Sequence, residues 1–562
     1  MNVISDCRIG SACAPLSPIS EWKETTALNV WGGGQLMAFS ALDGPTDFQD
    51  GICLRTTFQG TGFETLHPGR CRFDIHDAPP LRCQIGGDFF EVETPAGRTR
   101  GALLDAHHLL VEGPLSPVAE VPEIAFLRQG TRALIGVRKH FNAALIDADL
   151  DAAMAARRHW LESQHIPLPS TPDARRTAIK ALSIMKTQVC TGEGLIRRRW
   201  TMPDRWPHRG MWLWDSAFHA IGWRHVDIGL AREMLEAVFD GQQPDGMVPL
   251  KSSPTGVAKN WTQPPVLALA AWMLHRTSPD REWLGRLYGP MCRYIEWDIA
   301  HRDSDGAGLM EWFIEENLNC RSGESGMDNS SRFDCAEALD ATDFNSYVAL
   351  ECELLASIAR ELGRKAEARR WADRRATLCA LINRRLWDEE RGFYFDCRAA
   401  TGERTDVMAV SGFLPLICGA PDRRQAERLA AHLDNPATFG SPLPVATIAP
   451  PSSPHYSKDM WRGPVWINLN WMVAMGMARY GFHEQASKIR ERTLREIEKW
   501  YAAGGALYEY YDDQCQAPPL QLMRKGGCDV EVLCRHVVPD YGWTTTLYLD
   551  MLLEPDFARK TP

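Results

Sequence analysis

Two acidic residues of the sequence stand in settings that suit proton transfer. Asp328 lies in a segment of small and polar residues at 324–331 (Glu-Ser-Gly-Met-Asp-Asn-Ser-Ser), where a tight loop would surround its carboxylate with hydrogen-bond donors. Glu509 lies between Tyr508 and Tyr510, whose rings would shield it from water. Each acid also has a purely structural interpretation, an Asx turn for Asp328 and an ion pair for Glu509.

Aromatic and polar side chains recur in other motifs of the chain. The segment 212–216 (Trp-Leu-Trp-Asp-Ser) would bring two indoles and a carboxylate to the start of a helix, where an Asp is often only a cap. Indole rings can stack on sugar rings, and an amide can both donate to and accept from a hydroxyl. The same residues could instead belong to the core or to ordinary loops. The candidate substrate-binding residues are Trp212, Trp214, Asp215, Gln263, Trp461, Arg462 and Trp466.

Two separated carboxylates in an aromatic-lined cleft are suited to glycoside hydrolysis. One carboxylic acid protonates the leaving oxygen, and the other carboxylate activates a water molecule or attacks the sugar. The sequence contains no Walker A, dinucleotide-binding, HExxH or GxSxG motif, which weighs against nucleotide-binding, zinc-protease and esterase functions. Its 16 cysteines form no CxxC pair and no zinc-ligand spacing with histidine. We therefore expect neither a metal nor an organic cofactor.

The candidate motifs fall on long connections between predicted helices. Residues 191–213, 240–263, 300–341 and 504–542 are much longer than ordinary helix–helix links, and long loops in compact domains are commonly functional. Twelve helices with alternating short and long connections predict six helical hairpins closed into a toroid, with a polar cleft at one end. We predict these helices at 171–190, 214–222, 227–239, 264–275, 279–299, 342–362, 365–386, 405–415, 421–433, 461–480, 484–503 and 543–553.

The sequence changes character near residue 165. Before it, short alternating runs such as 71–75 and 133–137 predict antiparallel strands that pack as a sandwich. Residues 149–163 predict a helix, and a Pro-rich stretch follows that cannot be helical throughout. We predict a mainly α protein whose parts are a β-rich, sandwich-like N-terminal domain at 1–147, a helical and Pro-rich linker at 148–170 and an (α/α)6 catalytic domain at 171–562.

Composition and charge exclude several classes of protein. The 562 residues include 62 basic and 72 acidic ones, a net charge of −10, and 44% are hydrophobic. This balance argues against a dedicated nucleic-acid binder and against a disordered chain. No apolar run could span a membrane, and the first 20 residues lack the pattern of a secretory signal. We expect a cytoplasmic monomer or small homo-oligomer whose partner is a small oligosaccharide or glycoside.

Taken in order, the motifs resemble glycoside hydrolase family 63, including its bacterial mannosylglycerate and glucosylglycerate hydrolases. The segments that carry the resemblance are WLWDSAFHAIG, QPDGMVP, TQPPV, ESGMDNS, WRGPVWINLN and LYEYYD, between about residues 200 and 553. The resemblance implies an (α/α)6 toroid and an exo-acting, anomer-inverting α-glycosidase. It assigns the general acid to Asp328 and the general base to Glu509, places Trp214 and Asp215 in the terminal-sugar subsite, and places the other candidate residues in the cleft.

Two segments depart from the family pattern. Ser331 stands where a Pro is common, and residues 512–519 lack the usual Thr-Gly turn. Residues 512–536 are therefore predicted to shape an unusual leaving-group pocket. Glu324 and Asp334 are candidate neighbours that would help Asp328 to keep its proton.

Several alternatives remain open. The substrate could be a gluco- or manno-configured glycoside, or the enzyme could be an α,α-trehalase, although its PGGRF-like signature is absent. A non-catalytic carbohydrate-binding toroid is a further possibility. Asp303 and Asp305 could bind calcium or form a plain acidic turn, since the third acidic position of a calcium loop is Ala307. The basic run 197–199 could be a solvated loop or could hold an acidic leaving group.

Overall fold

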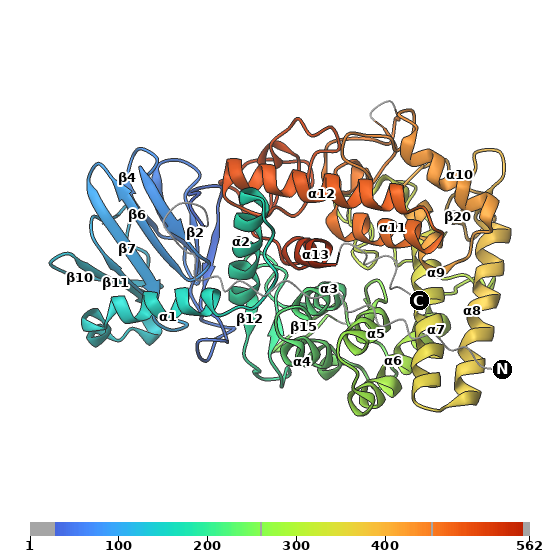
Figure 1. Ribbon diagram of the computed structural model, residues 1–562, viewed down its shortest axis with the longest axis horizontal. Helices are drawn as coiled ribbons and strands as arrows, with labels where there is room; N and C mark the ends of the chain where they lie inside the picture. The colour runs from blue at the N-terminus through green and yellow to red at the C-terminus, as the bar shows by residue number, and fades with distance from the viewer. Residues whose placement is uncertain (1–27, 259–260, 451–452, 555–562) are drawn as a thin grey trace, which may run out of the picture.

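The computed structural model describes residues 28–258, 261–450 and 453–554. Strands dominate up to Val137, and helices dominate after residue 149. Figure 1 shows the sheets at one end of the molecule and the helices at the other. The prediction of N-terminal antiparallel sheets followed by a mostly helical region is confirmed. Cys7 and Cys13 lie outside the described residues.

The N-terminal strands form two antiparallel sheets with a shared apolar core. Alternating residues give each sheet one buried face: Phe73 and Ile75 in one sheet join Phe90 and Val92 of the other in a single hydrophobic cluster. The first sheet has the order β1 (Leu36–Ala38), β2 (Cys53–Thr56), β3 (Thr61–His67), β4 (Arg72–His76) and β9 (Ser116–Pro117). The second has the order β10 (Ile124–Gln129), β11 (Arg132–Val137), β8 (His108–Glu112), β7 (Gly97–Leu103), β6 (Phe89–Thr94) and β5 (Arg82–Ile85).

The helical region alternates along the chain between outer and inner helices. After α1 (Leu150–Glu162), the outer helices are α2 (Pro172–Gln188), α4 (Ile228–Val238), α6 (Arg281–His301), α8 (Lys365–Arg385), α10 (Arg423–Asp434) and α12 (His483–Gly504). The inner helices are α3 (Leu213–Trp223), α5 (Leu267–Thr277), α7 (Thr342–Glu361), α9 (Pro415–Cys418), α11 (Ile467–Arg479) and α13 (Gly542–Leu553).

The inner helices pack on one another in a closed sequence. Each contacts the next one in chain order, from α3 through α5, α7, α9 and α11 to α13, and α13 contacts α3. Several outer helices cover the seams: α4 packs on α3 and α5, α6 on α5 and α7, and α12 on α11 and α13. In Figure 1, α13 is accordingly surrounded by other helices. Residues of α13 are buried along nearly its whole length, from Gly542 to Met551.

Short ribbons and single helical turns border the loops. The ribbons pair β12 (Val189–Cys190) with β13 (Trp200–Thr201), β14 (Met211–Trp212) with β15 (Lys251–Ser253) and β16 (Gly256–Val257), β17 (Leu339–Asp340) with β20 (Cys397–Arg398), and β18 (Trp387–Asp388) with β19 (Phe393–Tyr394). The 3-10 turns are η1 (Arg138–His140), η2 (Ala143–Asp147), η3 (Phe239–Gly241), η4 (Ser331–Phe333), η5 (Val410–Phe413), η6 (Met460–Arg462) and η7 (Pro519–Gln521).

Two predicted helices differ from the structure. The helix predicted at 405–415 is wrong: Ala409 forms a β-bridge with Ile448, and regular helix begins only at Pro415 and ends at Gly419, whose φ is +71°. The helix predicted at 461–480 begins instead at Ile467. Gly463 and Pro464 interrupt it, because a proline lacks the N–H that a helix interior needs.

The first strand is bonded to the last part of the helical region. The Gln35 side-chain amide donates to the carbonyl of Gly505 at 2.5 Å, and the Leu36 N–H donates to the carboxylate of Asp540 at 3.0 Å. The same carboxylate pairs with the buried Lys180 ammonium of α2 at 3.0 Å. The sheets are therefore anchored where the helical ring closes.

Two further findings concern the described part of the chain. Its cysteines form no disulfide. None of its helices is both long and apolar enough to cross a membrane.

Candidate active site

The predicted site residues lie on connections that run from an outer helix to the next inner helix. Trp212 lies directly before α3, Gln263 before α5, and Trp461 before α11. Asp328 lies between α6 and α7, and Glu509 lies between α12 and α13. Successive helices of a bundle joined in hairpins run antiparallel, so connections of the same kind emerge at the same end. The contacts among these segments agree with that arrangement.

Glu509 is buried and forms an ion pair with Arg524. Its Oε2 atom lies 3.1 Å from Arg524 Nε, and its own N–H donates to the carbonyl of Val538. Burial opposes the charge of Arg524, but Glu509, Tyr510 and Cys534 together outweigh burial and raise the pKa of the guanidinium. Arg524 Nη2 also lies 3.0 Å from His208 Nε2. The buried carboxylate of Glu509 is thus paired with a cation inside the protein.

Asp328 is more exposed and forms an ion pair with Lys525. Its Oδ2 atom lies 2.7 Å from Lys525 Nζ, and 23% of the Asp328 side chain is accessible. Its carbonyl accepts hydrogen bonds from the N–H groups of Arg321 and Ser322, which close the loop behind it. Burial lowers the pKa of Lys525, but the carboxylate of Asp328 outweighs this effect and raises it. Asp328 can therefore be reached by a ligand from solvent.

One short segment carries both cations. The backbone N–H groups of Lys525 and Gly526 donate to the carboxylate of Asp459 at 2.8 and 2.9 Å. Arg524 Nη1 donates to the carbonyl of Cys534 at 3.2 Å. These bonds fix residues 524–526 from two sides. The segment links the two candidate catalytic carboxylates through two adjacent side chains.

Asp215 lies in the first turn of α3 and is 2% exposed. Burial raises the pKa of its carboxyl well above the ordinary range, and the nearby Asp204 carboxylate adds to the effect. Glu509 acts on it in the same direction. The Tyr541 hydroxyl donates to Asp215 Oδ1 at 3.4 Å. A carboxyl that keeps its proton can donate a hydrogen bond to a sugar hydroxyl as well as accept one.

Trp214 connects three of the loops. Its backbone N–H donates to the side-chain oxygen of Gln263 at 3.3 Å. Its indole packs against Gly326, two residues before Asp328, so closely that a Cβ added at Gly326 would lie 2.3 Å from the ring. Gly326 also has a φ of +71°, which favours glycine. The loop that carries Asp328 is therefore seated on Trp214.

Trp461 and Trp466 stack on each other beneath this loop. Their ring centroids lie 3.6 Å apart at an interplanar angle of 7°, and both rings are about 1% exposed. The N–H of Trp461 donates to the side chain of Asn329 at 3.1 Å, and Trp466 lies 4.8 Å from the ring of Tyr510. The stacked pair of indoles thus contacts both the loop of Asp328 and the loop of Glu509.

The other two predicted cleft residues have different surroundings. Arg462 forms a bidentate ion pair with Asp334, at 2.8 and 2.5 Å, and donates to the carbonyl of Asn329. It therefore braces the loop after Asp328. Trp212 is partly exposed, with Lys251 Nζ 5.6 Å from its ring centroid and the His208 ring 5.9 Å away. It has the exposed aromatic surface that the buried indoles lack.

The predicted neighbours of Asp328 are engaged elsewhere. Glu324 pairs with Arg302 at 2.6 Å and accepts from the N–H of Thr262, and Asp334 pairs with Arg462. Each of the two carboxylates is thus held by its own cation, and their effect on the proton of Asp328 stays a prediction.

Sequence reasoning missed the residues that contact the two acids. Arg524 and Lys525 belong to no motif, and the only signal was the prediction that residues 512–536 shape the leaving-group pocket. Asp204 and Tyr541, which flank Asp215, had no signal at all. Their roles arise from contacts between distant connections.

Two other charged segments of the sequence lie outside this network of contacts. Residues 197–199 pair with Asp240, Glu236 and Glu233, so the basic run is bound to helix α4 and to η3. Asp303, Asp305 and Glu311 bring carboxylate oxygens within 4.8 Å of one another. Asp303 and Asp305 also accept backbone N–H groups of their own turn.

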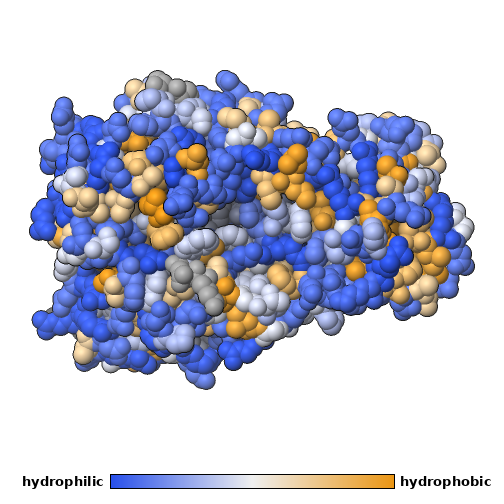
Figure 2. Space-filling view, turned by 180° about the vertical axis from the view of Figure 1, so that it is seen from behind, coloured by the Kyte–Doolittle hydropathy of each residue, from blue (hydrophilic) through white to orange (hydrophobic). Residues whose placement is uncertain are grey.

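The surface seen in Figure 2 is mostly hydrophilic, with scattered hydrophobic residues and a hollow near its centre. This character suits a polar ligand better than an apolar one.

The fold and the paired carboxylates point to a glycoside hydrolase, and comparison with known proteins supports this class. Residues 207–544 match the model of the mannosylglycerate hydrolase MGH1-like glycoside hydrolase domain, and the chain belongs to this family. The predicted family, with mannosylglycerate and glucosylglycerate hydrolases among its members, is confirmed. All the predicted site residues lie within the matched range, whereas strands β1–β11 precede it.

Similar proteins include a mannosylglycerate hydrolase of Thermus thermophilus, 28% identical over 59% of this chain and 94% of that protein. A glucosylglycerate hydrolase of Mycolicibacterium hassiacum is 24% identical over 55% of this chain and 87% of its own length. Among solved structures, the GH63 mannosylglycerate hydrolase of Thermus thermophilus in complex with Tris and D-glycerate has a TM-score of 0.54 and 26% identity. It covers 67% of this chain, and the match includes 100% of that structure.

Proposed function

We propose that this protein is an exo-acting, inverting α-glycosidase that hydrolyses a small gluco- or manno-configured glycoside, with Asp328 as general acid and Glu509 as general base. The observation that carries the proposal is the pair of carboxylates on two different connections, joined through Arg524 and Lys525. We further infer that the closed ring of inner helices and its outer layer form an (α/α)6 barrel. The domain boundaries at 147/148 and 170/171 belong to the same proposal.

In this mechanism Asp328 gives its proton to the glycosidic oxygen as the bond to the anomeric carbon breaks. A water molecule attacks that carbon from the opposite face, and Glu509 accepts the proton that the water loses. Such a pair stands about 6.5–9.5 Å apart, which leaves room for the water. The sugar acquires positive charge in the transition state, and hydrogen bonds from Asp215 to its hydroxyls would hold it in place.

Lys525 supports a leaving group that carries negative charge. Its ammonium pairs with Asp328 in the unliganded protein, but a general acid must be protonated before it acts. An anionic leaving group would attract Lys525 and free Asp328 to hold a proton. The relatives named after mannosylglycerate and glucosylglycerate make these two glycosides the first substrates to test.

The experiment is proton NMR of the hydrolysis products from a panel of α-linked substrates. The panel contains mannosylglycerate, glucosylglycerate, trehalose, kojibiose, nigerose and maltose, and the first spectra report which anomer forms before mutarotation. We expect β-anomer from one substrate, and loss of that activity in both Asp328→Asn and Glu509→Gln. Initial release of α-anomer would refute inversion, and cleavage that survives in both variants would refute the assigned acids.

The same panel separates the alternatives. Cleavage of trehalose alone would favour a trehalase. Absence of cleavage, together with saturable binding of one of the sugars, would favour a non-catalytic carbohydrate-binding protein.

A further inference from the structure

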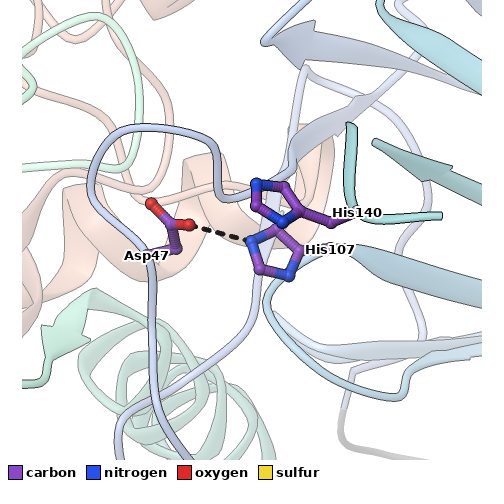
Figure 3. Close-up of side chains that lie close together, drawn as sticks. All are labelled: Asp47, His107 and His140. Atoms are coloured by element: carbon purple, nitrogen blue, oxygen red, sulfur yellow. Dashed lines mark hydrogen bonds and ion pairs between the residues drawn. The ribbon is translucent and has the colours of Figure 1, made fainter. Parts of the chain in front are cut away.

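A second cluster of chemically active side chains lies near the N-terminal sheets. Asp47, His107 and His140 each offer one ligand atom, and these three atoms lie within 4.8 Å of one another. Figure 3 shows the two imidazole rings one above the other, with the Asp47 carboxylate turned toward His107. His107 Nε2 lies 3.0 Å from Asp47 Oδ2, and the ring centroids of the two histidines are 4.1 Å apart.

Three separate segments supply these residues. Asp47 lies between β1 and β2, His107 between β7 and β8, and His140 in η1. Asp47 Oδ1 accepts the N–H groups of Gln49 and Asp50 at 2.8 Å, which fixes the turn and leaves Oδ2 for His107. The three side chains therefore converge through tertiary folding, and no local spacing in the sequence could have indicated them.

From this convergence we propose that Asp47, His107 and His140 bind a divalent transition-metal ion, with Zn²⁺ as the representative ion. Imidazole nitrogen and carboxylate oxygen are ligands that zinc prefers, at about 2.0–2.2 Å. Two ligands at such distances in a tetrahedral site lie about 3.3 Å apart, close to the separation of His107 Nε2 and Asp47 Oδ2. The third ligand atom, from His140, lies within 4.8 Å of the other two.

Asp50 would act as the supporting carboxylate. Its Oδ2 atom lies 2.9 Å from His140 Nε2, which leaves Nδ1 of that ring for the metal. A carboxylate hydrogen-bonded to the distal nitrogen of a ligating histidine is a common arrangement in zinc sites, since it orients the ring. Asp50 also pairs with Lys139 at 2.6 Å, so its position is set before any ion binds.

The donor atoms of the cluster suit a cation that is open to solvent. A metal ion would use one lone pair of each imidazole and would supply the positive charge that pairs with the Asp47 carboxylate. The side chains are 21–32% exposed, so an ion can enter from solvent.

The metal would fix a turn of the N-terminal part that contacts the helical region. Next to Asp47, Thr46 hydrogen-bonds to Thr191 through its N–H and hydroxyl, and the Phe48 N–H donates to Glu193 at 2.9 Å. Both partners follow α2. An ion at Asp47 would thus fix the turn that spans the two parts. The site precedes the matched family range and does not depend on the proposed glycosidase activity.

The test uses the full chain after dialysis against a chelator. Calorimetric titration with Zn²⁺ should give one strong site, Co²⁺ should give visible absorption bands of a complex with nitrogen ligands, and zinc-edge X-ray absorption should report two imidazoles. Zn²⁺ should also raise the Tm, because the assembled site binds it more tightly than the unfolded chain does. The variants His107→Gln, His140→Gln and Asp47→Asn should each weaken binding by at least about tenfold.

The matched control is the double variant Asp303→Asn/Asp305→Asn, which removes the separate acidic cluster and should leave zinc affinity unchanged. Circular dichroism of each metal-free variant checks that it is folded. Absence of strong binding by the wild-type chain would overturn the proposal, as would unchanged affinity in the three ligand variants. Loss of binding in the control variant would place the ion at the acidic cluster instead. If zinc-edge X-ray absorption of the wild-type protein shows no imidazole ligands, the proposed site is refuted, independently of the affinities of the variants.

Discussion

Arg524 and Lys525 are adjacent in the chain, yet their side chains pair with two different carboxylates, Glu509 and Asp328. The first pair is buried and the second is partly exposed. The two acids therefore have different electrostatic surroundings although one segment serves both. The proposed base therefore has a buried cation beside it, whereas the cation beside the proposed acid can be reached by a ligand.

Replacement of Lys525 by Gln should shift the pH dependence of activity. Without the ammonium, the protonated form of the neighbouring acid is favoured, so the alkaline limb of the kcat/KM profile should move to higher pH by up to about one unit. Steady-state rates between pH 4 and pH 9 measure this shift. An alkaline limb that stays in place would mean that Asp328 is not the group that titrates.

Replacement of Arg524 by Met should destabilise the fold. It leaves the buried carboxylate of Glu509 without its cation, which costs about 3–5 kcal/mol. Urea unfolding measures the loss of free energy. The double variant Arg524→Met/Glu509→Gln should recover part of it, because the uncompensated charge is gone. If the double variant is as unstable as the sum of the two single ones, the ion pair is not the cause.

Gly326→Ala should reduce kcat through the loop that carries Asp328. The new Cβ would meet the Trp214 indole at 2.3 Å, so the loop must move. Gly306→Ala is a matched control, because Gly306 has the same φ of +71° but no atom within 4 Å of an added Cβ. Both variants should be destabilised by about 1 kcal/mol, because alanine is strained in the left-handed backbone conformation. Only Gly326→Ala should also lower kcat, by at least about tenfold. Equal kcat values in the two variants would contradict the proposed seating of the loop.

A substitution in the N-terminal sheets should also affect catalysis. Arg55 of β2 is buried, pairs with Glu64, and lies 3.3 Å from His536, close to the segment that holds Arg524. We expect Arg55→Met to lower kcat and to cost about 3 kcal/mol of stability. Arg72→Met, which removes an exposed pair with Asp74 on the same sheet, should change neither by much. The free energy of unfolding and kcat of both variants test this. Equal effects of the two substitutions would contradict a role of the Arg55–His536 contact in catalysis.

Asp340 should make stability depend on pH. Burial raises the pKa of its carboxyl to about 7 in the folded protein, against an ordinary value of 3.8. Between these values the folded state binds more protons than the unfolded state, so Asp340 should lower the stability as pH rises from about 4 to 7. The contribution is a few kcal/mol, at about 1.4 kcal/mol per unit of pKa. Unfolding free energies at pH 5 and pH 7 should therefore differ less in Asp340→Asn than in the wild type. An unchanged difference would contradict the raised pKa.

The sequence allowed the motif-bearing loops and most of the helices to be predicted. Asp328 and Glu509 fall on connections whose length and composition set them apart, Trp214 follows such a connection at the start of α3, and the structure brings Trp214 into contact with the Asp328 loop. The helix predicted at 405–415 was wrong, because Ala409 forms a bridge with the distant Ile448 and only a 3-10 turn follows it. Local patterns cannot distinguish these outcomes.

The partners of charged groups could not be predicted for the same reason. Arg462 pairs with Asp334 across 128 positions of the chain, and Arg524 meets Glu509 after a long loop turns back. From the sequence alone, any of several acidic residues could have formed the ion pair with each of these arginines. Only the packing of the connections decides which acid does so.

The bonds from Gln35 and Leu36 to Gly505 and Asp540 have a consequence for synthesis on the ribosome. These bonds span 470 and 504 positions of the chain. The first strand therefore cannot form them until nearly the whole chain has been synthesised. The strands can pair among themselves early, but their attachment to the helices and the closure of the ring by α13 come last. Contacts of such long range slow folding, and a nascent chain that stops before Asp540 would leave both ends of the ring open.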